Sequence, residues 1–332
     1  MRRFPFQFSV LLALLLFAPV LARAQNVTCT MSSTGVAFSG VDPLSSRTDV
    51  NGTVSYSCKN SAGSQRSARV CISIGESGGG STNPRLMSGS GGTLQFQLFE
   101  DSARTQVWGS DVWGGNPTMG WSSNAFTLTL AANQTLTGSL TMYGRVLAGQ
   151  TGAAPGSYAD TYAAGDTLMT INEQAGATPP ASCGGTTTTG PFTFQVSASV
   201  IKNCNVSAND LNFGSVAAGN VPASGSTTLS VTCSNKMAYY VGLAPLSVAG
   251  TTGAGKMKGT GANTDTVAYQ LYQNSALTTV WGNTATSTSA GNGVAATGSG
   301  AAQSMTVYAK VTGSTDVTPD SYSDIVQVNV NY

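Results

Sequence analysis

Cysteine is the residue type whose number and spacing in this chain point most directly to chemistry. The chain has six cysteines, and an even number in an exported protein indicates disulfide bonds. Two pairs, one in each half of the chain, are separated by the same interval of 29 positions. The repeated interval identifies both pairs as bonded, and the two remaining cysteines pair by elimination. The predicted disulfides are Cys29–Cys58, Cys204–Cys233 and Cys71–Cys183.

Residues for enzymatic chemistry are scarce. The chain contains no histidine, which removes Ser-His-Asp and Cys-His catalysis and the usual zinc and iron sites. Asp160 and Asp324 both follow Ser-Tyr-x at equivalent places in the two halves, which favours a structural role for both. A glycosidase with paired carboxylates is the remaining enzymatic alternative, and no pattern favours it. The sequence therefore predicts a non-enzyme without catalytic residues, metal or other cofactor.

The N-terminus has the pattern of an export signal. Arg2 and Arg3 precede an apolar run over residues 8–21, and Ala-Arg-Ala follows at residues 22–24. This is typical of a secretory signal peptide over residues 1–24, and the apolar run is short for the alternative, a membrane anchor. Cleavage there leaves 12 basic and 14 acidic side chains. Without a basic patch, nucleic acid is not a predicted partner.

The two halves of the chain are similar to each other in order and spacing, which indicates two tandem copies of one module. Both are rich in short runs of alternating apolar and polar residues, which are typical of β-strands with one buried face. We therefore predict an all-β fold of two immunoglobulin-like β-sandwiches, an N-terminal module over residues 25–190 and a C-terminal module over 191–332. The clearest matches are Phe96 to Phe99 with Tyr269 to Tyr272, Trp108 with Trp281, Tyr143 with Tyr308, and Ser157 to Asp160 with Ser321 to Asp324.

One alternating stretch lies between the two copies and can belong to either. Its apolar residues are separated by single polar or small ones, as in a strand with one buried face. It either completes the N-terminal module as a strand contributed within the same chain or forms the first strand of the C-terminal module. The sequence leaves both assignments open. The apolar residues of this donor-type strand are Phe192, Phe194, Val196, Ala198 and Val200.

A segment of the N-terminal module without a counterpart is the candidate binding surface. Trp113, Met119 and Trp121 lie among Gly, Pro, Ser and Asn, which mark loops. Large apolar side chains in a loop either fill a core or form an exposed contact patch, and we favour the patch. The Gly-rich segment 75–92 is expected to be a mobile turn that leaves Leu86 and Met87 in a loop. Trp108 and Trp281 are expected in the cores.

The C-terminal module contains a set of recognisable motifs, which are Cys204, Leu211 to Gly214, Leu229 to Cys233, Tyr269 to Tyr272, Trp281-Gly282 and Tyr322 to Tyr332. With these motifs it resembles the spore coat U-type domain over nearly all of residues 192–332. The resemblance implies a subunit of an archaic chaperone–usher pilus, with an immunoglobulin-like sandwich that lacks one strand. A neighbouring pilin's N-terminal extension would complete it by β-strand addition, beside the C-terminal strand that ends at Tyr332. The implied assembly partners are a periplasmic chaperone and an outer-membrane usher.

A two-module member resembles the tip adhesin of such a pilus. Only four positions separate Gln25 from Cys29, so we expect no donor segment ahead of the N-terminal module and a subunit that ends the fibre. The expected function is attachment to hydrophobic surfaces and biofilm formation, with the protein exported through the periplasm to the pilus tip. A carbohydrate stacked on Trp113 or Trp121 is the other expected ligand. The alternative function is a structural subunit of a secreted coat or outer surface layer.

Overall fold

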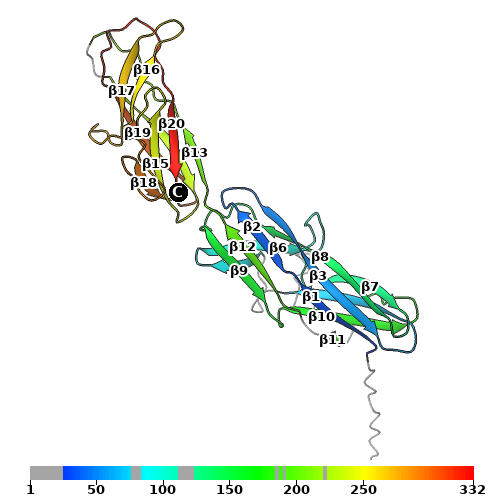
Figure 1. The fold of residues 1–332 in the computed structure, drawn as a ribbon. Helices are drawn as coiled ribbons and strands as arrows, with labels where there is room; N and C mark the ends of the chain where they lie inside the picture. The colour runs from blue at the N-terminus through cyan, green and yellow to red at the C-terminus, as the bar shows by residue number, and fades with distance from the viewer. Residues whose placement is uncertain (1–24, 76–83, 111–122, 184–186, 190–191, 220–222) are drawn as a thin grey trace, which may run out of the picture.

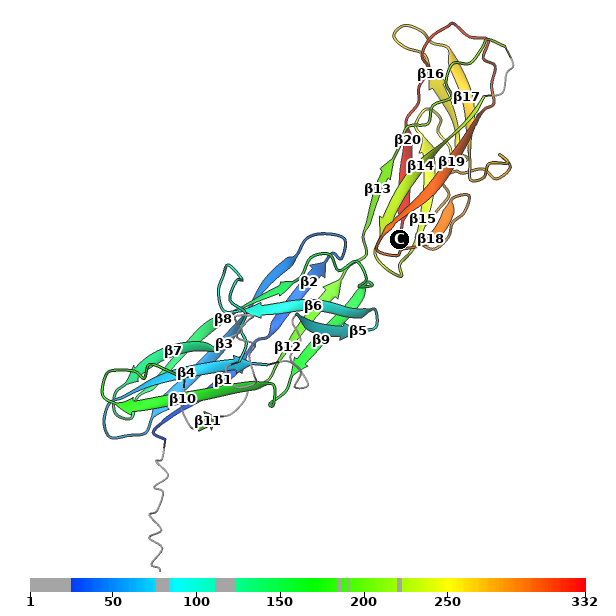
Figure 2. The same cartoon turned by 180° about the vertical axis from the view of Figure 1, so that it is seen from behind.

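The computed structural model describes residues 25–75, 84–110, 123–183, 187–189, 192–219 and 223–332. The described residues form strands, turns and loops without a helix, which confirms the predicted all-β fold. Figures 1 and 2 show two elongated modules joined end to end. Among the described residues, no helix is long and apolar enough to cross a membrane. The predicted signal peptide lies outside the described part of the chain.

The N-terminal module consists of two packed sheets. The larger has the strand order β1-β3-β8-β6-β5-β9-β12-β2, and the smaller has the order β11-β10-β4-β7. The strands are β1 (Val27–Ser33), β2 (Val36–Val41), β3 (Thr48–Asn60), β4 (Arg66–Ile74), β5 (Arg85–Gly89), β6 (Gly92–Phe99), β7 (Asn124–Leu130), β8 (Thr135–Val146), β9 (Gly156–Tyr162), β10 (Thr167–Ala175), β11 (Thr187–Thr189) and β12 (Phe194–Val200).

The C-terminal module repeats this plan with fewer strands. One sheet has the order β13-β14-β19-β17-β16 and the other has the order β18-β15-β20. Since β12 lies in the sheet of the first module, the connection between the modules is residues 201–203. The strands are β13 (Cys204–Ala208), β14 (Ser224–Cys233), β15 (Ala238–Pro245), β16 (Ala254–Lys258), β17 (Thr266–Tyr272), β18 (Val294–Thr297), β19 (Ala302–Val311) and β20 (Val326–Asn331).

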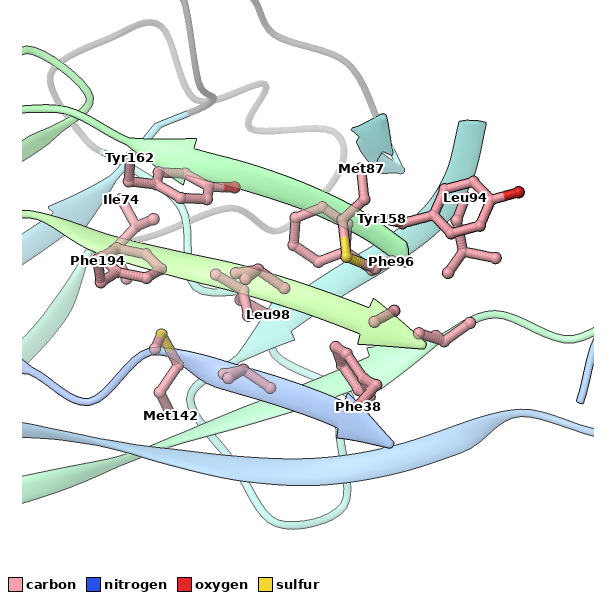
Figure 3. Close-up of a cluster of buried hydrophobic side chains, with 14 of the residues drawn as sticks. Phe38, Ile74, Met87, Leu94, Phe96, Leu98, Met142, Tyr158, Tyr162 and Phe194 are labelled. Atoms are coloured by element: carbon pink, nitrogen blue, oxygen red, sulfur yellow. The ribbon is translucent and has the colours of Figure 1, made fainter. Parts of the chain in front are cut away.

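Each module is built around one buried tryptophan, as the repeat predicts. Trp108 and Trp281 are almost completely buried. The indole Nε1 of Trp108 donates to the carbonyl of Ile72 at 2.8 Å, and that of Trp281 donates to the carbonyl of Val241 at 2.9 Å. A buried indole N–H needs such a partner. The equivalent bonds show that the two copies share one core design, and Figure 3 shows aliphatic and aromatic side chains of the N-terminal core.

The structure contains the three predicted disulfides. Two of them join directly paired positions of neighbouring strands, Cys29 with Cys58 and Cys204 with Cys233. In the chain-entropy description, each loop of 29 positions stabilises its module by about 3–4 kcal/mol. The Cys71–Cys183 bond closes a loop of 112 positions, for which the same description gives about 5 kcal/mol.

The expected mobile turn over residues 75–92 is wrong in its second part. Residues Arg85–Gly89 form β5, which pairs with β6 through a tight hairpin at Gly89 and Gly92. Met87 is fully buried in the core, whereas Leu86 is 39% exposed. A strand of only five residues between glycine-rich segments has too little alternation to stand out in the sequence.

Candidate functional site: the open groove of the C-terminal module

The donor-type stretch lies in the N-terminal module. Strand β12 is the neighbour of β9 on one side, antiparallel from Phe194–Tyr162 to Val200–Gly156. On its other side β12 runs parallel to β2, with Val196 beside Val36. The sequence leaves two assignments of this strand open. In the structure, the chain supplies the strand to its own N-terminal module.

The inner face of β12 is a large part of the N-terminal core. All five apolar side chains of the stretch are at most 6% exposed. Phe194 stacks on Tyr162, as Figure 3 shows, and the backbone N–H of Phe192 donates to the hydroxyl of Thr167 at 3.0 Å. Burial of five such side chains contributes on the order of 10 kcal/mol before entropic costs. The N-terminal module is a complete sandwich because of this strand.

The described part of the C-terminal module has no strand in the equivalent place. By position, Leu211 to Phe213 corresponds to Val36 to Phe38 of β2, and Ser321 to Asp324 corresponds to Ser157 to Asp160 of β9. Neither segment of the C-terminal module is a strand, and the second makes a single isolated bridge, between Ser323 and Lys258. Among the described residues, the two segments that flank β12 in one module thus lack a shared neighbour in the other.

A groove lies between these two segments. It has a volume of about 580 Å³, and buried residues of the C-terminal core form its floor. It is lined by Leu211 and Phe213 of one segment and by Tyr322 of the other, together with Val326 of β20. The apolar floor consists of Leu229, Leu243, Leu271, Val307 and Ala309. A groove with an apolar floor, bordered by two segments that are not strands, can accept an extended peptide as an additional strand.

Polar contacts position the wall formed by residues 322–324. The hydroxyl of Tyr269 donates to Asp324 Oδ2 at 2.7 Å, and the Ser247 hydroxyl donates to the same oxygen. Burial, and then the hydrogen bond to Asp324, raise the pKa of Tyr269 above its usual value, so its hydroxyl stays protonated as a donor. The corresponding acid of the N-terminal module, Asp160, is only 8% exposed. The hydrogen bonds to Asp324 agree with the structural role that the sequence favours for it, whereas Asp160 lies inside β9.

A tyrosine fixes the same wall in both modules. Tyr158 donates its hydroxyl to the carbonyl of Ala154 at 2.7 Å, and Tyr322 donates to the carbonyl of Thr318 at 2.6 Å. In each case the tyrosine bonds the backbone four positions earlier and closes a local loop. The same local loop therefore precedes both segments, although residues 321–324 are not a strand.

The predicted surface-binding residues Trp113, Met119 and Trp121 lie outside the described residues. The described residues that border this segment, Ser110 and Ser123, are both buried. Nearby, Arg85 is buried and donates from Nη2 to the carbonyls of Ile74 and Trp108, both at 2.8 Å. No sequence pattern predicts this buried arginine, which lies two positions before the buried Met87 in β5.

The described residues offer no metal site. No group of three or more His, Cys, Asp or Glu side chains among them could hold a metal ion. The carboxylate with most cationic neighbours is Asp49, which contacts Arg47, Arg104 and Arg145 within 4 Å. Asp49 lies beside Arg145 across β3 and β8, so this cluster fastens two strands together.

Comparison with known proteins agrees with this architecture. The model of the Spore Coat Protein U domain family matches residues 16–165 and 191–329. A chain of the chaperone–tip adhesion subunit complex CsuC–CsuE, from the archaic chaperone–usher Csu pili of Acinetobacter baumannii, is 17% identical with a TM-score of 0.51. The match covers 92% of this chain and 100% of that one.

A second solved structure is more distant, and no curated protein matches the sequence. The CooA pilin subunit from enterotoxigenic Escherichia coli is 10% identical with a TM-score of 0.25. That match covers 52% of this chain and 99% of that one. Of the two structures, only the first therefore bears on the fold.

Proposed function

This chain belongs to the Spore Coat Protein U domain family, and we propose that it is the tip subunit of a chaperone–usher fibre. Its family and fold are those of structural proteins and not of enzymes. One observation carries the proposal. The place that β12 fills in the N-terminal module is an open apolar groove in the C-terminal module. One module is complete within the chain, and the other needs a strand from another protein.

The N-terminal module is a template for how the missing strand would bind. Because β12 is antiparallel to β9 and parallel to β2, the incoming strand would run antiparallel to residues 321–324 and parallel to residues 211–213. Ala198 is the residue of β12 that lies beside both Phe38 and Tyr158, and the corresponding walls of the groove are Phe213 and Tyr322. The incoming segment should therefore alternate apolar residues and have a small one between these two rings.

The proposed partners follow from this need. An open apolar groove aggregates when exposed, so a periplasmic chaperone would cover it during export and an adjacent pilin would replace the chaperone at the outer-membrane usher. The similarity to a chain of a chaperone–tip adhesion subunit complex supports the chaperone step. The protein would then lie on the cell surface, at the end of the fibre.

The tip position is supported by the self-completed N-terminal module. Since β12 occupies the place of a donated strand, that place is not open to a strand from a further subunit. The module would be free to face the environment, and we propose that Trp113, Met119 and Trp121 provide its contact with hydrophobic surfaces during attachment and biofilm formation. These side chains offer large apolar area in an adaptable contact.

Immunogold labelling of native cells with an antibody to this protein tests the proposal. Gold confined to the ends of surface fibres is the expected result. Gold along the shafts would contradict the tip position but keep the strand-accepting groove. Gold spread over the envelope without fibres would contradict both and favour a structural protein of a coat or surface layer. A strain without the gene is the control for antibody specificity.

A further inference from the structure

We infer a mechanical function for β12: it carries any pulling force that acts between the two modules, and the Cys71–Cys183 disulfide limits the extension when β12 leaves its sheet. This inference goes beyond strand acceptance by the groove. It rests on the proposed fibre function only for the source of the force, since a surface-bound tip subunit is pulled by its own fibre.

The connection between the modules has no slack. Strand β12 ends at Val200 and β13 begins at Cys204, so three residues link the sheets. These residues are hydrogen-bonded to both modules, through Ile201 N to Val41 O at 2.9 Å, Asn203 Nδ2 to Asp42 Oδ2 at 2.7 Å, and Ser234 N to Asn203 O at 2.9 Å. A displacement of the C-terminal module therefore acts on β12 directly.

The direction of the force relative to the strand gives high resistance. Figure 1 shows β12 running toward the C-terminal module, with β1 leading to the opposite end of the N-terminal module. The hydrogen bonds of an antiparallel ladder lie perpendicular to the strands. A pull along β12 therefore loads its bonds to the antiparallel β9 together, in shear, rather than one after another. Seven residue pairs join β12 to β9.

Side chains add to this resistance. Val196 in the middle of β12 is fully buried in the N-terminal core. Sliding of β12 by one residue would turn its buried face toward solvent, because side chains alternate with a period of two. At the start of the stretch, the Thr167 hydroxyl both accepts from the Phe192 N–H and donates to its carbonyl. Both features oppose movement along the strand axis.

The third disulfide lies directly upstream of this strand. Cys183 is bonded to Cys71 of β4, an inner strand of the smaller sheet. If β12 is pulled out, the chain can straighten only from Val200 back to Cys183. That segment is 17 positions long, which corresponds to about 55–60 Å of extended chain. The 112 positions that the disulfide closes remain outside the path of the force.

Single-molecule force spectroscopy on the purified full chain, held at its two ends, tests the disulfide limit. We expect the native protein to lengthen by less than about 55–60 Å as β12 detaches, because the folded segment already spans part of its extended length. In the double variant C71A/C183A, extension of the N-terminal module should increase by the 112 bracketed positions, about 370–400 Å of additional chain. If the N-terminal module extends equally far in the native protein and in the double variant, the disulfide does not limit the extension and the inference is overturned.

A matched pair of core variants tests whether β12 bears the load and does not depend on the disulfide variant folding. Val196→Ala in β12 and Val70→Ala in β4 remove the same atoms from fully buried positions. We expect Val196→Ala to lower the rupture force of the N-terminal module and Val70→Ala to leave it nearly unchanged. Equal effects would overturn the load-bearing role. Because no fibre is needed, this failure is distinct from failure of the proposed tip function.

Discussion

Tyr162 and Phe194 stack with ring centroids 4.4 Å apart and with planes only 3° from parallel. Tyr162 belongs to β9 and Phe194 belongs to β12, so the contact joins the body of the N-terminal module to its last strand. The two residues are also directly paired in the ladder. Aromatic contact and backbone pairing thus act at the same position, which makes this pair a sensitive probe of how much the module depends on β12.

Phe194→Ala should destabilise the N-terminal module by about 3–5 kcal/mol, because it removes a buried aromatic side chain together with its stacking contact with Tyr162. The measurement is unfolding in denaturant, followed by the intrinsic fluorescence of the tryptophans. Gln195→Ala is the matched control, since Gln195 lies on the same strand but faces solvent. Equal stability of the two variants would contradict the packing role of β12.

Leu211→Asp should prevent incorporation of the protein into surface fibres. It places a charge in the wall of the groove, where an inserted apolar strand would cover it, and burial of an unpaired charge is costly. Leu246→Asp is the control, because Leu246 is 60% exposed and does not line the groove. Immunogold counts at fibre ends would measure the effect. Normal incorporation of Leu211→Asp would contradict the strand-acceptor proposal.

Gly255→Ala should destabilise the C-terminal module by about 1–3 kcal/mol through overpacking. A Cβ atom at residue 255 would lie 2.3 Å from Cζ of Tyr269. The ring would have to move, and its hydroxyl would lose Asp324 as a hydrogen-bond acceptor. Thermal unfolding measures the loss. Gly250→Ala is the control, since a Cβ there has no atom within 4 Å; a similar loss in both variants would point to backbone effects instead.

The free energy of unfolding of the N-terminal module should decrease at acidic pH, because Asp49 becomes protonated there. Hydrogen bonds from Arg145 at 2.7 and 2.9 Å hold the pKa of Asp49 below its usual value of 3.8. A carboxylate whose folded pKa is depressed stabilises the fold above its unfolded pKa, and this contribution is lost as pH falls through the folded pKa. We therefore expect the contribution at neutral pH to disappear below about pH 4.

The measurement is the unfolding free energy of the native chain and of Asp49→Asn between pH 7 and pH 2. The variant should be less stable at neutral pH, and the difference should shrink in acid. Arg145→Lys should give an intermediate result, because lysine keeps the charge but cannot donate two parallel hydrogen bonds. A stability difference that does not depend on pH would contradict the assignment.

Replacement of Trp113, Met119 and Trp121 by alanine should reduce attachment to hydrophobic surfaces at least severalfold, with fibres still formed. The reason is the loss of large apolar contact area from the proposed patch. Retention of labelled fibres on glass and polystyrene would measure it. Leu86→Ala provides a control at a described, 39% exposed apolar position of the same module. Undiminished attachment would favour another contact surface.

Much of the architecture is readable from local patterns. The equal spacing of two cysteine pairs predicts all three disulfides, since the third follows by elimination. The repeat of Trp108 in Trp281 predicts two equivalent cores. By contrast, β5 is missed because Arg85 to Gly89 is short and lies between glycine-rich segments. Arg85 itself is missed because an arginine is buried only when several carbonyls converge on it, and those carbonyls come from separate segments.

The sequence by itself determined that two modules of one β-fold follow each other and that residues 192–200 form a strand with one apolar face. Alternation with a period of two is a local property, so any strand with a buried face shows it. Only the tertiary structure decided which module receives that strand, because pairing depends on the edges that distant segments present. Here Val36 and Asp160 flank Val196, while Leu211 and Asp324 flank an open groove.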